Sequence, residues 1–349
     1  MEVRNPAFFQ TPSFWVTEYG EVLEALRARP KGSCETAGTS AGGREIGCIA
    51  YGEFEEVKRT ATFSSAIGAG YPPAFFGETR RRKPVLAIVS SIHGSEVEGC
   101  ATLMNFIHVI ETGRDLRGRP WSNLQRLASQ MRIVMVPLAQ PDGRVRCGIT
   151  NLVGGDIDDV YYYGQGLTRA GEILRWPECK RRHPVAAEEM AFLGGYYNDD
   201  GVNIQHEDFF SPTLAPETRS LLDLVRREVP DCVLSLHSCG AGPFFIAPDN
   251  LIAQSYQYLQ LQLATIVAAR HRMAGLRPND SPRTGPVGGF HFQTAVHYAS
   301  GALPLLFEFP HGLRGKPYTL DEILDTGLTM LEEVLGFGTA WGYLPPEMR

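Results

Sequence analysis

The sequence predicts an α/β fold in which a mixed, mostly parallel central sheet carries helices on both faces. Four short apolar runs have the length of buried strands, at residues 85–91, 132–138, 232–237 and 303–309, and longer helical stretches separate them. Strands that alternate with helices typically form parallel sheets covered on both faces. Neither an internal repeat nor a low-complexity linker interrupts the chain, so we expect a single domain, 1–349, with an N-terminal helical extension over residues 1–40.

The remaining elements follow from local patterns along the chain. Residues 13–30 have the pattern of an amphipathic helix that ends near Pro30, and strand-like stretches follow around 45–51 and 60–65. Further helices are expected at 96–111, 125–130, 185–193, 215–228, 250–274 and 319–335. Residues 143–200 otherwise show little periodicity and are rich in Gly, Tyr and Asp. Because long irregular stretches in compact domains are commonly functional, we expect this one to contribute to a site.

The composition argues against several classes of function. With 33 Lys and Arg against 39 Asp and Glu, the net charge is -6, and no basic stripe indicates nucleic-acid binding. No run approaches the roughly 18 apolar residues of a membrane span. The N-terminus lacks the pattern of a secretory signal, and the seven dispersed cysteines form no Cys-x-x-Cys pair. We therefore expect a cytoplasmic protein without nucleic-acid or membrane partners, and leave its oligomeric state open.

Histidine and glutamate side chains stand at or just past the ends of three of the apolar runs. His93 and Glu96 form a His-x-x-Glu motif after the first run, His237 ends the third, and Glu308 follows Leu-Leu-Phe in the fourth. In open α/β sheets, ligands bind outside the carboxyl ends of the strands. Imidazole and carboxylate are good zinc ligands, and a catalytic zinc site has three protein ligands plus an open position. The His-x-x-Glu spacing alone is a weak signal, but the shared placement predicts a zinc site.

Glu308 is expected to be buried, because it follows three large apolar residues. An unpaired buried carboxylate is costly and must be neutralised, paired or coupled to a metal. Beside a metal site, such a carboxylate can take a proton from water and later pass it to a leaving amine. Glu308 is therefore the candidate general base.

Together these residues resemble the signature of the zinc metallocarboxypeptidases of the carboxypeptidase A type. That family takes two zinc ligands from His-x-x-Glu, the third from a distant His-Ser (here His237-Ser238), and its general base from a Phe-Glu strand. Pro-Asp-Gly at 141–143 resembles the family's Asn-Pro-Asp-Gly turn, and Gly-Arg at 43–44 resembles its early Gly-Arg. The resemblance covers roughly residues 35 to 340 and implies a carboxypeptidase-like fold in one catalytic domain.

The activity that this resemblance implies is zinc-dependent hydrolysis of a bond in a peptide or a small amide. One zinc ion would be held by His93, Glu96 and His237. Glu308 would act as general base and then as general acid.

The chain departs from the family in the segment that binds the substrate's terminal carboxylate. Family members carry an Asn-Arg pair there, whereas the matching residues here are Gln205 and His206. A histidine cannot make the bidentate, permanently charged contact of a guanidinium. Either Gln205 and His206 belong to a solvated polar turn, or the substrate's end group is not a simple carboxylate or is held elsewhere.

Three further site residues are predicted by their position relative to the family's motifs. Arg181, in the basic stretch after Trp176, is matched to the arginine that stabilises the oxyanion; the alternative is a surface basic turn. His291 stands near the position of the family's tyrosine, and is otherwise a partly buried loop histidine. Gln293 falls near the floor of the specificity pocket, where a neutral amide suits neither a strictly basic nor a strictly aromatic preference.

Two other functions stay open at this point. The aspartoacylase-like deacylases share the His-x-x-Glu…His site and hydrolyse N-acyl amino acids. They usually carry an additional C-terminal β domain, and no such segment follows the last predicted helix, which favours the peptidase-like branch. A catalytically inactive binding module is less expected, because all three ligands and the base are present.

Overall fold

A seven-stranded mixed sheet forms the centre of the protein, whose computed structural model describes residues 5–279 and 289–348. The strand order is β1-β2-β4-β3-β7-β9-β8. The four inner strands β4, β3, β7 and β9 run parallel, and β1, β2 and β8 join them antiparallel at the two edges. The strands are β1 (Ser33–Thr39), β2 (Glu45–Tyr51), β3 (Val85–Ser90), β4 (Arg132–Val136), β7 (Cys232–Cys239), β8 (Phe244–Phe245) and β9 (Leu303–Pro310). The predicted fold class is confirmed.

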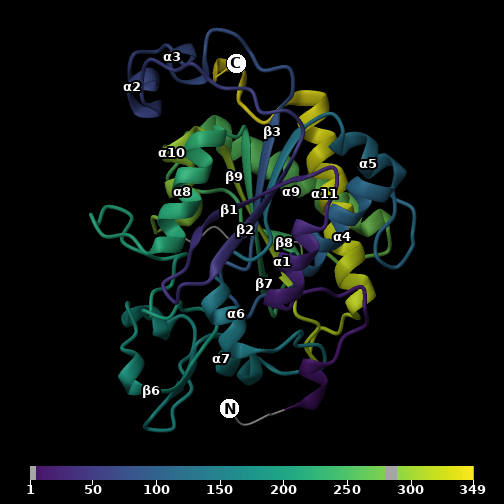
Figure 1. Cartoon of the computed structure of the whole chain (residues 1–349), viewed down its shortest axis with the longest axis vertical. Helices are drawn as coiled ribbons and strands as arrows, with labels where there is room; N and C mark the ends of the chain where they lie inside the picture. Colours follow the sequence, from purple (N-terminus) through teal and green to yellow (C-terminus); the bar gives the residue numbers. More distant parts are fainter. Residues whose placement is uncertain (1–4, 280–288, 349) are drawn as a thin grey trace.

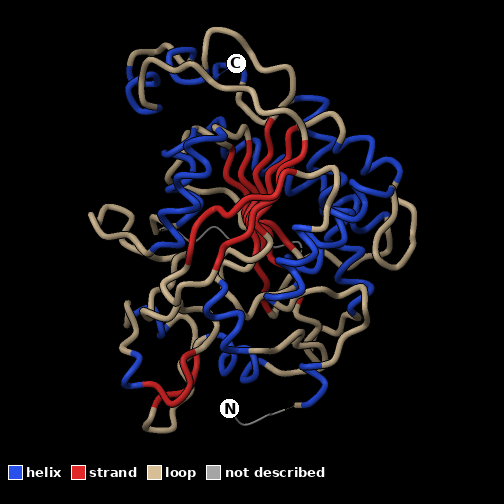
Figure 2. Tube along the Cα trace, viewed as in Figure 1, coloured by secondary structure: helices blue, strands red, loops and turns tan. Residues whose placement is uncertain are grey.

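Helices cover both faces of this sheet, as Figures 1 and 2 show. One face carries α1 (Tyr19–Arg27), α4 (Glu98–Thr112), α5 (Ser122–Ala128), α9 (Gln254–Met273) and α11 (Leu320–Trp341); the other carries α8 (Pro216–Glu228) and α10 (Phe292–Ser300). Alternate residues of each strand enter the two cores, so that Leu86 and Ile88 face the first set of helices and Ala87 and Val89 the second. Burial on both faces explains why the inner strands are continuous apolar runs.

The two ends of the sheet carry smaller elements. The short helices α2 (Phe63–Gly68) and α3 (Pro73–Phe76) lie at one end (Figure 1). The carboxyl ends of the parallel strands face the other end, where α6 (Pro141–Cys147), α7 (Ile157–Gly164) and the hairpin β5 (Gly166–Thr168) and β6 (Met190–Leu193) are found. Single turns of 3-10 helix complete the described elements: η1 (Pro6–Phe9), η2 (Glu178–Arg181), η3 (Ala187–Glu189) and η4 (Pro346–Met348).

Three sequence predictions differ from the structure. The strand expected at 60–65 is wrong, because the Thr62 hydroxyl accepts a hydrogen bond from Ser65 N at 3.3 Å and begins helix α2 instead. The helix expected at 185–193 is also wrong, since residues 190–193 pair with β5 as strand β6. The N-terminal extension expected over residues 1–40 contains α1 but ends in β1, the edge strand of the sheet.

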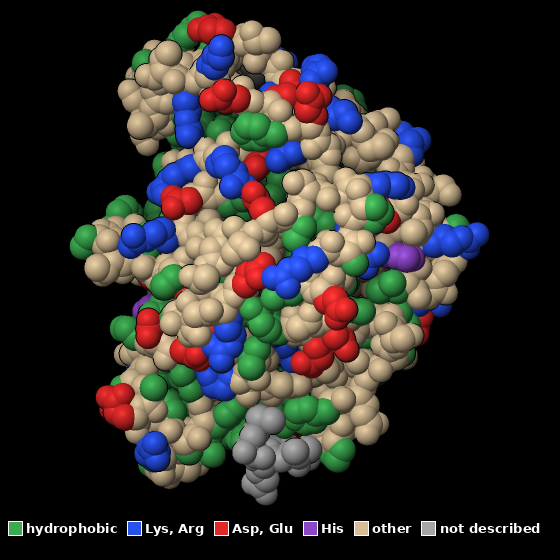
Figure 3. Space-filling model, viewed as in Figure 1, with side chains coloured by type: hydrophobic (Ala, Val, Ile, Leu, Met, Phe, Trp, Pro, Cys, Tyr) green, Lys and Arg blue, Asp and Glu red, His purple; other side chains and the backbone are tan. Residues whose placement is uncertain are grey.

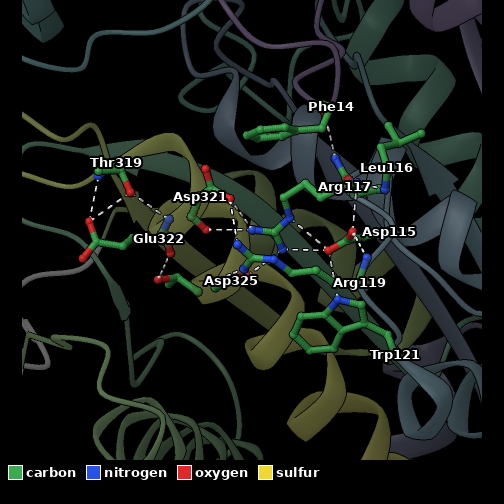
Figure 4. A network of polar contacts seen from close by, with 12 residues as sticks. Phe14, Asp115, Leu116, Arg117, Arg119, Trp121, Thr319, Asp321, Glu322 and Asp325 are labelled. Carbon is green, nitrogen blue, oxygen red and sulfur yellow. Dashed lines mark hydrogen bonds and ion pairs between the residues drawn. The ribbon is translucent and has the colours of Figure 1, made fainter.

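A partly buried ion-pair network connects the loop after α4 to the start of α11 (Figure 4). Arg117, whose side chain is 6% exposed, lies 2.7 Å from Asp115 Oδ2, 2.6 Å from Asp325 Oδ1 and 3.1 Å from Asp321 Oδ1. Trp121 Nε1 donates a further hydrogen bond to Asp115 at 3.1 Å. Burial tends to raise the pKa of Asp115, but the hydrogen bonds from Arg117 and Trp121 outweigh it and lower that pKa.

The surface shows no segregation of charge on the face drawn in Figure 3, where Lys and Arg side chains are interspersed with Asp and Glu. Of the helices in the described ranges, none combines the length and the apolar character needed to cross a membrane.

Candidate metal centre and active site

Three buried metal-ligating side chains converge at the carboxyl edge of the sheet. His93 and Glu96 lie on the turn that leaves β3, and His237 lies near the end of the neighbouring parallel strand β7. Their exposed fractions are 5%, 3% and 3%. His93 Nδ1 is 2.8 Å from Glu96 Oε1, and His237 Nδ1 is 3.0 Å from Glu96 Oε2. Ligand atoms of all three residues lie within 4.8 Å of one another.

The spacing of these atoms fits a tetrahedral zinc ion. Zinc bonds of about 2.0–2.1 Å at tetrahedral angles place ligand atoms about 3.3 Å apart, close to the distances found here. Burial alone would raise the pKa of Glu96, but His93 and His237 outweigh it, and the pKa of this carboxyl lies well below its usual range. Glu96 therefore stays ionised, which is the form that binds a metal.

The turn that carries His93 is held by close backbone contacts. Gly94 N donates to Gly195 O at 2.7 Å, and a Cβ at Gly94 would lie only 2.1 Å from Arg144 N in α6. No larger residue fits at position 94 without moving the turn. Ser238 N donates to Glu96 Oε2 at 3.1 Å and fixes the orientation of this carboxylate from β7.

A second layer of side chains orients His93. Asn203 Oδ1 lies 3.1 Å from His93 Nε2, and the ring of Tyr196 stacks on the imidazole with centroids 3.9 Å apart and an interplanar angle of 6°. Because an amide oxygen only accepts hydrogen bonds, Asn203 favours the tautomer with the proton on Nε2. The lone pair of His93 is then on Nδ1, on the side of Glu96.

Glu308 stands beside this cluster on β9. It is the register partner of His237 in the β7–β9 pair, and its Oε2 is buried without a hydrogen-bond partner in the described part of the chain. Burial and the nearby charge of Glu96 raise the pKa of Glu308 to about 7. A carboxyl with a pKa near neutrality can both accept and release a proton under ordinary conditions.

The sequence reasoning missed a buried network behind these residues. Glu98, 1% exposed, lies 2.8 Å from His311 Nδ1 and accepts a hydrogen bond from Ser238 Oγ at 2.6 Å. Burial lowers the pKa of His311, but Glu98 outweighs this effect and the net shift is upward. The signal was available: His311 directly follows strand β9, and Glu98 repeats the acidic residue two positions after Glu96.

Four of the residues predicted to bind substrate come together as two pairs. Gln205 Nε2 donates to Gln293 Oε1 at 2.6 Å, and Gln293 Nε2 donates back to Gln205 Oε1 at 3.2 Å. His206 Nδ1 and His291 Nδ1 are 3.0 Å apart. The loop that carries Gln205 and His206 also carries Asn203, which contacts His93.

Arg181 does not join these residues. It lies exposed on η2, and its side chain makes no hydrogen bond or ion pair with any residue that the structure describes. The cation that acts on the histidine pair is its neighbour Lys180, whose charge lowers the pKa of both His206 and His291 after the larger effect of burial. The Lys180 ammonium lies 5.0 Å from the centre of the Trp176 ring.

A hydrogen-bond network beside the site joins the residues that resemble the early Gly-Arg to the Pro-Asp-Gly turn. Asp142 accepts hydrogen bonds from Ser40 Oγ at 2.5 Å, Gly42 N at 2.9 Å and Arg44 Nη1 at 2.8 Å. Arg44 also pairs with Asp199 at 2.7 Å. These contacts hold α6 against the β1–β2 turn and thereby fix the backbone against which Gly94 packs.

A large apolar groove lies elsewhere on the protein. It has a volume of about 920 Å³ and runs along α9 to the C-terminal segment, lined by residues that include Tyr258, Ile266 and Trp341. No histidine, cysteine or carboxylate lines it. The groove therefore lacks the side chains that bind zinc or transfer protons, whereas the His-Glu-His cluster has them.

Comparison with protein families shows what the chain is similar to. Residues 20–155 match the family described as zinc carboxypeptidase, a segment that includes His93 and Glu96. The resemblance inferred from the sequence is thereby confirmed. No curated protein sequence matches the chain.

Solved structures with the same fold include metallocarboxypeptidases of low sequence identity. A metallo-carboxypeptidase from Burkholderia cenocepacia is 14% identical with a TM-score of 0.55, and covers 91% of this chain and 67% of its own. One from Pseudomonas aeruginosa, in complex with (2-guanidinoethylmercapto)succinic acid, is 15% identical with a TM-score of 0.52, covering 95% and 69%. The carboxypeptidase A from Helicoverpa armigera is 16% identical with a TM-score of 0.52, covering 94% and 74%. At these identities the likeness shows the fold.

Proposed function

We propose that the protein is a zinc-dependent hydrolase of peptide or amide bonds, in which His93, Glu96 and His237 hold one zinc ion and Glu308 is the general base. The observation that carries this proposal is the convergence of three buried ligand groups beside Glu308, whose Oε2 is buried with no hydrogen-bond partner among the described residues. The match of residues 20–155 to the zinc carboxypeptidases supports the choice of metal.

The residues divide the chemistry between them. Zinc, when bound, supplies a positive charge that acidifies a water molecule and polarises the scissile carbonyl. Glu308 receives the proton of the attacking water and delivers it to the leaving amine, a use that fits its pKa of about 7. Asn203 and Tyr196 hold the imidazole of His93 in place while the reaction proceeds.

A small-molecule amidase is the second candidate within this chemistry. The histidine at position 206 favours it, because a histidine replaces the arginine that a peptide's terminal carboxylate would require. Peptides and N-acyl amino acids offered to the same preparation decide between the two, by identification of the released products.

Metal analysis and one substitution test the proposal. We expect one zinc ion per chain, and we expect Glu308→Gln to keep the zinc while lowering kcat about 10²–10⁴-fold. Glu217→Gln is the matched control, because Glu217 is also buried with a raised pKa but bonds to Ala41 N and Asn198. A protein that binds no zinc, or a Glu308→Gln variant as active as Glu217→Gln, would sink the proposal.

We further propose a cytoplasmic location. Its support is that all seven cysteines are free, as expected for a reducing compartment. Recovery of the protein in the membrane or extracellular fraction of its cells would contradict this location.

A further inference from the structure

His206 and His291 form a contact pair at the position where the sequence lacks a guanidinium. Their rings meet edge to face, with centroids 4.6 Å apart at an angle of 83°, and their Nδ1 atoms are 3.0 Å apart. The two-way bond between Gln205 and Gln293 lies directly beside them, and Phe292 N donates to Gln205 O at 3.1 Å. Hydrogen bonds between the residues next to His206 and those next to His291 therefore fix the two histidines relative to each other.

A hydrogen bond between two Nδ1 atoms constrains the protons of both rings. One Nδ1 must donate and the other must accept, so the rings cannot both carry two protons. Burial lowers the pKa of each imidazole, and the Lys180 charge lowers both further; Asp249 acts weakly the other way on His291, and His93 and His237 add to the lowering at His206. Both rings are consequently neutral at pH 7.

A neutral pair presents one donor and one acceptor to its surroundings. The ring that donates through Nδ1 has a bare lone pair on Nε2, and the ring that accepts has a proton on Nε2. Neither Nε2 makes a hydrogen bond with a residue in the described ranges. At His291 this edge lies over Gly289, where a Cβ would come within 2.6 Å of Cε1 and 3.1 Å of Nε2, so only glycine leaves it open.

This pattern of donor and acceptor matches an amide better than a carboxylate. A carboxamide offers an oxygen that accepts and an N–H that donates, and both would be satisfied. A carboxylate offers acceptors alone, so one of its oxygens would face the lone pair of an imidazole without a proton between them. A buried polar group left unpaired in this way costs a large share of binding.

Two exposed aromatic side chains contact the residue next to His291. Phe290, which precedes His291, lies 5.0 Å from the ring of Phe210 and stacks on Tyr298 at 6.2 Å and 17°. Phe210 is 80% exposed and Tyr298 is 46% exposed. Apolar surface of this kind favours a substrate portion that is uncharged.

We propose that His206 and His291 recognise a neutral amide on the leaving side of the scissile bond, so that the substrate ends in a carboxamide or continues as a peptide. The inference rests on the proposed hydrolase function, since it names the substrate class of that same site. Asn203 links the two, because its side chain contacts His93 and its carbonyl accepts the backbone N–H of His206 at 3.0 Å.

Binding to the slow Glu308→Gln variant tests this specificity directly. N-benzoyl-glycyl-L-phenylalaninamide and the free acid N-benzoyl-glycyl-L-phenylalanine differ only in the end group. We expect calorimetry on zinc-loaded Glu308→Gln to give the amide a Kd at least about tenfold lower than that of the acid at pH 7.5. N-benzoyl-glycyl-L-phenylalanyl-L-alanine separates the two sources of the amide: binding like the amide indicates a continuing peptide, and binding only of the capped amide indicates a terminal carboxamide.

His206→Arg in the same background should reverse the preference, because a guanidinium offers donors alone and a fixed charge. The acid should then bind at least about tenfold more tightly than the amide. His108→Arg on α4 makes the same substitution at a histidine outside both pairs and should leave the ratio of the two Kd values unchanged.

Three results with zinc-loaded Glu308→Gln would overturn the inference: tighter binding of the acid than of the amide, equal affinities, or no binding of either compound. Loss of acid binding in Lys180→Gln would identify Lys180 as the anchor of a carboxylate and would overturn it as well. Failure of the proposed hydrolase is distinguishable, because it leaves the amide bound preferentially while wild-type protein releases no product from any of the three compounds.

Discussion

Replacing Asn203 by Ala should weaken zinc binding while leaving all three ligands in place. Asn203 Oδ1 makes the contact of 3.1 Å with His93 Nε2 that sets the tautomer and the orientation of the ring. Loss of such a partner typically costs about 10–100-fold in metal affinity, or about 1.4–2.7 kcal/mol. The same oxygen accepts Gln205 N at 3.0 Å, and leaving that buried donor unpaired should lower the free energy of unfolding by about 1–3 kcal/mol.

A competitive titration with the chromophoric chelator 4-(2-pyridylazo)resorcinol measures the zinc Kd of each variant. Asn203→Asp keeps an acceptor and adds charge, so its affinity should equal or exceed that of the wild type. Asn198→Ala is the matched control, because Asn198 is also buried in the same segment but its side-chain oxygen accepts hydrogen bonds from Asp200 N and Val202 N instead. An unchanged Kd in Asn203→Ala, or an equal loss in Asn198→Ala, would refute the argument.

Three further outcomes are expected. Gly94→Ala should lower both Tm and zinc affinity, because its Cβ would lie 2.1 Å from Arg144 N. Gly336→Ala is the control: its Cβ would have its nearest neighbour 3.9 Å away, so it should raise the free energy of unfolding by roughly 0.5–1 kcal/mol. Thermal melts that rank the two variants the other way would contradict this. Arg117→Met should cost about 3 kcal/mol at pH 7, since it leaves Asp115 buried without its partner. The pKa of Asp115 is lowered in the folded protein, so the ionised carboxylate stabilises the fold above the unfolded-state pKa, and this stabilisation is lost as pH falls through the folded-state pKa. Denaturant unfolding should therefore show that the loss of stability in Arg117→Met becomes smaller below about pH 4. A loss that stays constant with pH would argue against the ion pair. Zinc at 100 times its Kd should add about 2.7 kcal/mol to the free energy of unfolding, and EDTA should reverse this increase. A Tm that does not change with EDTA would contradict binding of zinc to the folded protein.

The parts of the fold that sequence reasoning predicted are those buried on both faces. Strand β3 is buried along its whole length, so it is a continuous apolar run, and β9 is nearly so. The sequence prediction includes the residues of strand β1 in an N-terminal helical extension, because an exposed edge strand carries no apolar pattern. Residues 190–193 were assigned to a helix because their pairing with β5 depends on a partner more than twenty residues away, which local periodicity does not report.

Within the candidate site, too, the residues carried by strands could be predicted from the sequence, and the position of the residue on η2 could not. His93 and Glu96 follow strand β3, His237 and Glu308 lie near the ends of β7 and β9, and the parallel register brings all four to one edge of the sheet. Arg181 was matched to the oxyanion-stabilising arginine only by its place in a basic stretch, and in the structure it lies exposed on η2, away from the histidine pair. The effect of the neighbouring Lys180 charge on His206 and His291 depends on tertiary contacts, which the sequence pattern does not report.

Asn203 contacts the metal centre through its side chain and the His206–His291 pair through its backbone, so zinc affinity and end-group preference can change independently. Its side chain holds His93, whereas only its backbone carbonyl holds His206. A substitution at His206 keeps that backbone bond and should change the preferred end group without altering the zinc Kd. A substitution at Asn203 removes the side-chain contact and, through the unpaired Gln205 N, loosens the loop that presents His206. Zinc affinity and end-group preference should therefore change together in Asn203→Ala and separately in His206→Arg. The strand-end ligands can thus remain fixed while one loop position redirects the substrate that they act on.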